Sequence, residues 1–83
     1  MKTLRNLRPG QPARVARVHG QGALRLRVME MGLTPGVSVL VRKIAPLGDP
    51  IEIIVRDSAL SLRKADAALV EIEYIDVYGS GVI

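Results

Sequence analysis

The 83-residue chain contains no cysteine, phenylalanine or tryptophan, and it has one histidine and two tyrosines. Without cysteine it can form neither a disulfide nor a thiolate metal site, and it has no cysteine nucleophile. A lone histidine, His19, leaves only scattered carboxylates for a transition metal, so we expect no dedicated metal site. The scarcity of aromatic residues disfavours base stacking on single-stranded nucleic acid and aromatic grooves for proline-rich peptides.

Catalytic and nucleotide-binding motifs are missing from the sequence as well. The acidic residues are not grouped at an acid/base or ligand spacing, and no serine has an evident base partner. Gly20-Gln21-Gly22 is not a dinucleotide fingerprint, because Arg25 stands where the third glycine belongs. We therefore predict a protein that is not an enzyme, with no catalytic residue and no cofactor.

Long hydrophobic runs are absent too. No apolar stretch approaches the roughly 20 residues of a membrane-spanning helix, and the first residues lack the apolar stretch of a signal peptide. With 48% hydrophobic and 24% charged residues, the composition is that of a globular chain with one small core. We therefore expect a single cytoplasmic domain.

The positive charge is concentrated in the first third of the chain. Residues 1–29 carry seven basic and no acidic residues, a net charge of +7, whereas residues 30–83 carry five basic and eight acidic residues, a net charge of −3. This asymmetry suits an acidic protein surface, an anionic membrane face or nucleic acid, and it is equally typical of a merely solvated basic face. The charge alone does not choose among these partners.

One stretch predicts a short helix that ends sharply. Leu24, Val28 and Met31 fall in one stripe at about 100° per residue, so we expect them to face the core. Gly32 supplies the left-handed residue that ends the helix, and Leu33 is then expected to pack back on Val28.

A turn follows at once. In Thr34-Pro35-Gly36-Val37, Pro35 fixes φ at the second position and Gly36 accepts the positive φ of the third, as a type II turn requires. The chain therefore reverses and enters a strand.

The remaining pattern predicts a small β protein. Apolar residues alternate in several short stretches, with a bulge expected in the first and a hairpin around the loop 45–50. Five short strands cannot form two full sheets, so we predict a small, strongly bent barrel that closes to remove its edges. The predicted strands cover 13–18, 37–44, 51–56, 60–62 and 69–75, with one helical turn at 63–67, a domain at 1–75 and a tail at 76–83.

Two features could form a binding surface. Leu26 and Met29 are expected on the helix face opposite the core, where methionine suits an adaptable contact, although single exposed apolar residues are ordinary and the N-terminal segment could cover them. The loop Pro46-Leu47-Gly48-Asp49-Pro50 is the other feature. Its two prolines lower the ordering cost of binding, but a rigid hairpin connection that needs Gly48 for its φ explains it equally well.

Three motifs, in this order and spacing, strongly resemble those of the FeoA family, the small cytosolic component of bacterial ferrous iron transport. They are 31–36 (Met-Gly-Leu-Thr-Pro-Gly), 45–51 (Ala-Pro-Leu-Gly-Asp-Pro-Ile) and 60–67 (Leu-Ser-Leu-Arg-Lys-Ala-Asp-Ala). The resemblance spans roughly residues 4–75. It implies an SH3-like barrel of about five strands with one short helix between the first two, and it implies an accessory role for the membrane iron permease FeoB, whose cytosolic part binds and hydrolyses GTP. The residues that match the first motif, expected to serve the fold, are Met31, Gly32, Leu33, Pro35 and Gly36.

Two functions therefore compete. The first is a non-enzymatic module, monomeric or weakly self-associating, that regulates FeoB by protein contact on the cytosolic side. The second is a free-standing relative of the SH3-like C-terminal domain of iron-dependent repressors, acting near DNA, against which the missing helix-turn-helix argues. We expect no nucleic-acid partner, and the residues that we select for partner contact are Leu26, Met29, Pro46, Leu47, Gly48 and Asp49.

Overall fold

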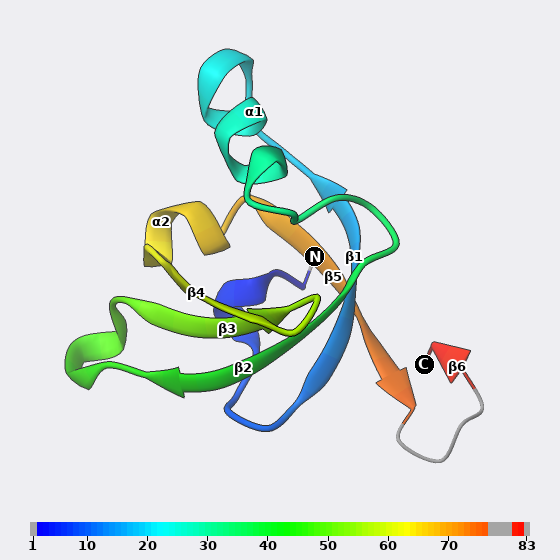
Figure 1. Ribbon diagram of the computed structural model, residues 1–83, viewed down its shortest axis with the longest axis vertical. Coiled ribbons are helices and arrows are strands. Elements are labelled where there is room, and N and C mark those ends of the chain that lie inside the picture. Colours follow the sequence, from blue (N-terminus) through cyan, green and yellow to red (C-terminus); the bar gives the residue numbers. More distant parts are fainter. Residues whose placement is uncertain (1, 77–80, 83) are drawn as a thin grey trace.

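A computed structural model describes residues 2–76 and 81–82, which form a curled antiparallel sheet with two helices (Figure 1). Helix α1 lies between the first two strands, as predicted, and the single-turn helix α2 precedes β5. The elements are β1 (Pro12–Val18), α1 (Gly22–Glu30), β2 (Ser38–Ile44), β3 (Ile51–Val55), β4 (Ser58–Leu62), α2 (Lys64–Ala67), β5 (Val70–Asp76) and β6 (Gly81–Val82), with 3₁₀ turns at Leu4–Asn6 and Pro46–Gly48.

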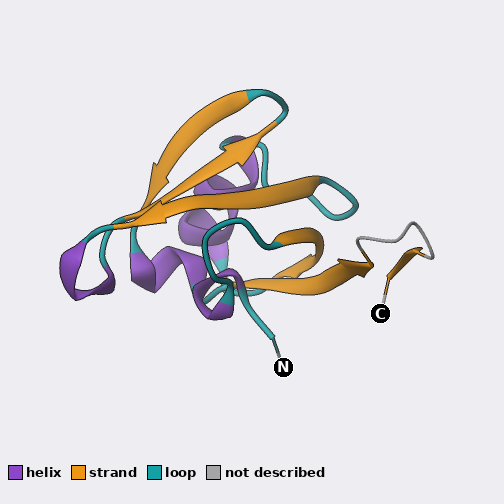
Figure 2. Cartoon of the chain, turned by 90° about the horizontal axis from the view of Figure 1, so that it is seen from below, coloured by secondary structure: helices purple, strands orange, loops and turns teal. Residues whose placement is uncertain are grey.

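The sheet is not closed, which corrects the expectation of a closed barrel. Its strand order is β4-β3-β2-β1-β5-β6, so β4 and β6 form opposite edges. Figure 2 shows the strands curling over one another. Segments outside the sheet complete the core instead, because Leu4, Leu7, Val28, Leu33 and Ala67 are buried in the same cluster as the strand residues. Strand counting could not anticipate this cover, since it comes from loops and helix ends.

The core follows the alternation of the strands. Val39 and Val41 of β2, Ile53 of β3 and Val70 and Ile72 of β5 are each at most 4% exposed. Residues between them point to the other face, as the period of two dictates.

The first strand carries the predicted bulge. The β1–β5 register shifts between Val15 and Arg17, so β1 bends at Ala16. A second shift, between Val41 and Lys43, bends β2. These two bends contribute to the curl of the sheet.

The predicted helix stop and turn are confirmed. Gly32 has φ +101° directly after the last helical turn, and both Leu33 and Val28 are fully buried in the core cluster. Gly36 has φ +94°, and the Val37 N–H donates to the Thr34 carbonyl at 3.1 Å, as in a type II turn. The motif 31–36 therefore shapes the fold.

The predicted core stripe of α1 is wrong at its first residue, and the predicted outer face is wrong at Met29. Leu24 is 41% exposed, and Val28 is the one buried residue of the helix. Met29 is partly buried against the core. The reason is that the first half of α1 projects beyond the sheet, where it has no surface to pack on (Figure 1).

Within the predicted tail, Gly81–Val82 pair antiparallel with the end of β5, while residues 77–80 and 83 lie outside the described part of the chain. No helix among the described residues has both the length and the apolar character needed to cross a membrane.

Candidate protein-binding surface

The connection between β2 and β3 is a tight turn that displays one leucine. The Gly48 N–H donates to the Ala45 carbonyl at 2.9 Å, and the Ala45 N–H donates to the Pro50 carbonyl at 3.0 Å. Leu47 occupies the third position of this turn with φ +74°, where glycine or asparagine is favoured. We call residues 46–49 the Leu47 turn.

The side chain of Leu47 is 99% exposed. A left-handed conformation costs a residue with a Cβ atom about 1–2 kcal/mol, and this side chain recovers nothing by packing within its own domain. A single exposed leucine is ordinary, and Arg56 and Asp57 also have positive φ in an exposed turn. Leu47 differs from them in being apolar, so it is the candidate anchor for another molecule.

Asp49 fixes the turn to helix α2. The backbone N–H of Lys64, the first residue of α2, donates to the Asp49 Oδ1 atom at 2.9 Å. This N–H is one of the donors that a helix N-terminus leaves without an intrahelical partner. Asp49 thus satisfies a backbone group of α2 and holds the base of the Leu47 turn in place.

A small hollow of about 210 Å³ lies beside the turn, lined by Lys43, Ala45, Pro50, Glu52 and Ser61. The Glu52 Oε2 atom is buried and accepts no hydrogen bond within the described part of the chain. The Lys43 ammonium lies 3.9 Å from this atom, and the Arg42 guanidinium lies 3.8 Å from Oε1 of the same carboxylate. Both cations are exposed, so these ion pairs compensate only part of the cost of burying the oxygen without a donor.

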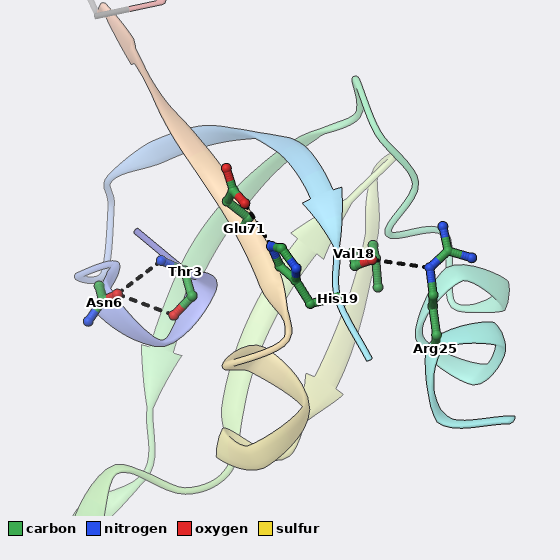
Figure 3. A network of polar contacts seen from close by, with 6 residues as sticks. All are labelled: Thr3, Asn6, Val18, His19, Arg25 and Glu71. Atoms are coloured by element: carbon green, nitrogen blue, oxygen red, sulfur yellow. Dashed lines mark hydrogen bonds and ion pairs between the residues drawn. The ribbon is translucent and has the colours of Figure 1, made fainter. Parts of the chain in front are cut away.

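Helix α1 carries a second candidate contact. Leu26 is 57% exposed and Leu24 is 41% exposed, and because they are two residues apart they point to different sides of the helix. Two arginines tether the helix to the body: Arg25 Nε donates to the Val18 carbonyl at 3.1 Å (Figure 3), and Arg27 Nη2 donates to Asp66 Oδ1 at 2.9 Å.

The structure does not bring the two predicted surfaces together. Pro46, Leu47, Gly48 and Asp49 form one compact turn, whereas Leu26 lies on α1, with α2 and β4 between them in Figure 1. Met29 faces the core. Leu26 and the Leu47 turn are thus separate candidate contacts.

Two pairs of residues that lie far apart in the sequence were not predicted, His19 with Glu71 and Arg27 with Asp66. The His19 Nε2 and Glu71 Oε1 atoms lie 2.7 Å apart (Figure 3), and this hydrogen bond holds the pKa of the Glu71 carboxyl below its usual range, with burial opposing the effect and Arg17 assisting it. His19 is therefore engaged with β5, whereas the sequence indicated plain polar surface. Asp66, which the sequence left ungrouped, is 8% exposed and pairs with Arg27.

Metal ligands do not gather anywhere in residues 2–76 and 81–82. No three histidine, aspartate or glutamate side chains of this part converge in a way that could hold an ion. The surface thus offers apolar contact, hydrogen bonds and charge.

The chain is similar to known proteins over most of its length. The family model described as "FeoA domain" matches residues 2–74. Among curated proteins, the chain is 42% identical over 72 residues to the Fe(2+) transport protein A/Fe(2+) transporter FeoB fusion protein of Porphyromonas gingivalis (strain ATCC BAA-308 / W83). That match covers 87% of this chain and 8% of the fusion protein, so the chain spans less than a tenth of the relative's length.

Solved structures of FeoA proteins have a similar fold. The solution structure of iron(II) transport protein A from Clostridium thermocellum matches with a TM-score of 0.85 at 38% identity, covering 89% of this chain and 46% of that one. FeoA of Stenotrophomonas maltophilia, solved with zinc and described as a prokaryotic SH3 domain protein, matches with a TM-score of 0.77 at 27% identity, covering 88% and 91%.

A more distant likeness concerns the fold alone. The T. acidophilum IdeR structure matches with a TM-score of 0.73 at 18% identity, over 87% of this chain and 32% of that one. The expected SH3-like architecture is confirmed, and because the family model matches residues 2–74, the chain belongs to the FeoA domain family, whose members take part in ferrous iron transport.

Proposed function

We propose that this FeoA protein is a non-enzymatic accessory of ferrous iron uptake and that it acts by binding the transporter FeoB through the Leu47 turn. The relative in P. gingivalis carries an FeoA part and FeoB in one polypeptide. Fusion gives two parts a high effective concentration for each other, which supports a functional association of the separate chains.

The observation that carries the choice of surface is the strained and exposed Leu47. Burial of a leucine side chain in a partner's pocket yields about 1.5–3 kcal/mol, which is equal to or larger than the conformational cost of about 1–2 kcal/mol for its positive φ. The turn is already ordered by its two backbone hydrogen bonds and by Asp49. Such preorganisation lowers the entropy cost of binding.

FeoB, as the resemblance implies, is a membrane permease whose cytosolic part binds and hydrolyses GTP. In the proposed complex the FeoA chain sits on the cytosolic side of FeoB, and its contact alters the GTPase cycle or the gate. The basic first third of the chain speeds approach to an acidic or membrane-adjacent surface.

A binding measurement between this chain and full-length FeoB of the same organism in nanodiscs tests the proposal. Leu47→Asp is expected to weaken binding by about tenfold or more, as for a central anchor residue. Leu26→Asp tests the other candidate contact in the same way, because it places the same charge on another exposed leucine. Loss of binding with Leu26→Asp and unchanged binding with Leu47→Asp would move the interface to α1, and a parent chain that does not bind FeoB refutes the association.

The competing function, a free-standing relative of repressor domains acting near DNA, rests on the likeness of the fold. Within residues 2–76 and 81–82 the helices are α1 and the four-residue α2, which do not form a helix-turn-helix. A steep fall of DNA affinity with rising salt would favour this function, since phosphate contacts release counterions.

A further inference from the structure

A hollow near the start of the chain is lined by neutral and basic residues. It has a volume of about 600 Å³, and none of the seven lining residues in the described part of the chain is acidic. It lies between the first 3₁₀ turn, the Pro9–Gly10 turn and β5. Cavities of this size accommodate small organic ligands. The side chains in it that carry hydrogen-bond donors are Lys2, Asn6, Arg8, Gln11 and Tyr74.

The two amides in this hollow are oriented as donors. The Asn6 Oδ1 atom accepts hydrogen bonds from the Thr3 N–H at 2.9 Å and from the Thr3 hydroxyl at 3.2 Å. Figure 3 shows the Asn6 oxygen turned toward Thr3 and its nitrogen turned away. The Gln11 Oε1 atom accepts from the Arg8 N–H at 3.3 Å. Because each oxygen is already used, the NH₂ groups remain to donate to a ligand.

The two cations of the hollow are available as well. Neither Lys2 nor Arg8 forms an ion pair with a carboxylate in the described part of the chain. The Lys2 ammonium lies 5.9 Å from the centre of the Tyr74 ring, within range of a cation–π interaction that places it at the hollow. The planar guanidinium of Arg8 matches the oxygens of a phosphate group in pairs.

We propose that this hollow binds a phosphate group, carried either by a soluble phosphate compound or by the headgroup of an anionic phospholipid. Two positive charges, two oriented amides and a tyrosine hydroxyl, with no carboxylate among the described lining residues, are complementary to an oxyanion that has only acceptors. A cation site would need oxygen ligands of the opposite kind. The inference does not depend on FeoB binding, since it uses neither the Leu47 turn nor α1.

Two probes distinguish the sources of the phosphate. Inorganic pyrophosphate is titrated into the full chain while the side-chain amide signals of Asn6 and Gln11 are followed by NMR. Co-sedimentation is measured with phosphatidylglycerol vesicles and with phosphatidylcholine vesicles. Saturable shifts with pyrophosphate support a soluble ligand, and sedimentation with the anionic vesicles alone supports a lipid headgroup.

A charge-matched pair of variants decides whether the hollow itself binds. Lys2→Gln/Arg8→Gln is expected to weaken binding of the active probe by about tenfold or more, because charged hydrogen bonds to the ligand are lost. Arg5→Gln/Arg56→Gln removes the same charge at exposed positions outside the hollow and is expected to change binding by less than about twofold. Equal weakening in both variants, or no binding of either probe by the parent chain, overturns the proposal. All four substituted residues are exposed, so amide spectra are expected to confirm that both variants stay folded.

Discussion

The Oδ1 atom of Asp49 accepts a hydrogen bond of 2.9 Å from the backbone N–H of Lys64, fifteen residues later in the chain. A side chain of the Leu47 turn thus takes the role that a local capping residue would play for α2, because the residue before the helix, Arg63, makes no capping hydrogen bond with its side chain. This one hydrogen bond therefore stabilises both the Leu47 turn and α2.

Asp49→Ala should therefore lower the free energy of unfolding by about 1 kcal/mol, the usual cost of losing a cap. Asp49→Asn keeps an acceptor oxygen and should cost less. Urea denaturation of both variants measures the difference. Equal stability of the alanine variant and the parent chain would show that solvent satisfies the Lys64 N–H as well as Asp49 does.

Leu47→Gly should weaken binding to FeoB without lowering the stability of the fold. Glycine adopts a positive φ without the steric cost that leucine carries, and it loses no buried contact at a position that is 99% exposed. Part of this gain is cancelled by the larger backbone freedom of glycine in the unfolded chain. The expected result is an unfolding free energy equal to that of the parent or higher by up to about 1 kcal/mol, together with weakened binding to FeoB. A clear loss of stability would mean that Leu47 serves the fold.

The pair of His19 and Glu71 predicts a pH dependence of stability. Because the pKa of Glu71 is lower in the folded chain than the usual value of 4.5, this carboxylate stabilises the fold fully above that pH. The contribution is lost as the pH falls through the folded-state pKa. In His19→Ala the pKa of Glu71 should rise, since the hydrogen bond from His19 is the largest cause of its shift. NMR titration of the Glu71 side-chain carboxyl carbon measures it.

Urea denaturation at a series of acidic pH values measures how strongly the stability depends on Glu71. Glu71→Gln should flatten the decline of stability with falling pH, and Glu73→Gln is the comparison, because it removes a carboxylate from the same strand and keeps the pair of His19 and Glu71. If both variants behave alike, the pH dependence arises elsewhere in the chain.

Local signals were sufficient to predict β1 to β5 and the turn that enters β2. Alternation identified the buried faces of β2, β3 and β5, and Pro35 with Gly36 identified the turn that enters β2. These patterns depend on neighbours within a few residues, so a sequence displays them directly.

Contacts set by the sheet were harder to predict. His19 and Glu71 lie 52 residues apart and meet because β1 pairs with β5. The buried face of α1 could not be predicted from its own period, since that face depends on where the sheet ends. Gly48 gave the expected positive φ, but the positive φ of Leu47 before it carries no sequence signal.

Helix α1 should be among the least stable parts of the described fold. It has nine residues and one buried side chain, and a helix this short is marginal without packing. The ion pair of Arg27 and Asp66 is thus an important tether, although more than half of the Arg27 side chain is exposed and solvent weakens the pair. Its loss should cost about 0.5–1 kcal/mol of local stability. This cost raises the equilibrium constant for local opening of α1 about two- to fivefold.

Hydrogen exchange followed by NMR measures this opening. Backbone amides of α1 should exchange faster than those of β3 in the parent chain, because α1 opens without unfolding the sheet. Arg27→Gln should accelerate exchange in α1 further and leave β3 unchanged, whereas Arg5→Gln, which removes the same charge from an exposed site in the first 3₁₀ turn, should alter neither. If Arg27→Gln leaves exchange in α1 unchanged, Val28 and the Arg25 contact to Val18 alone hold the helix, and the leucines of α1 then present a surface whose order is independent of α2.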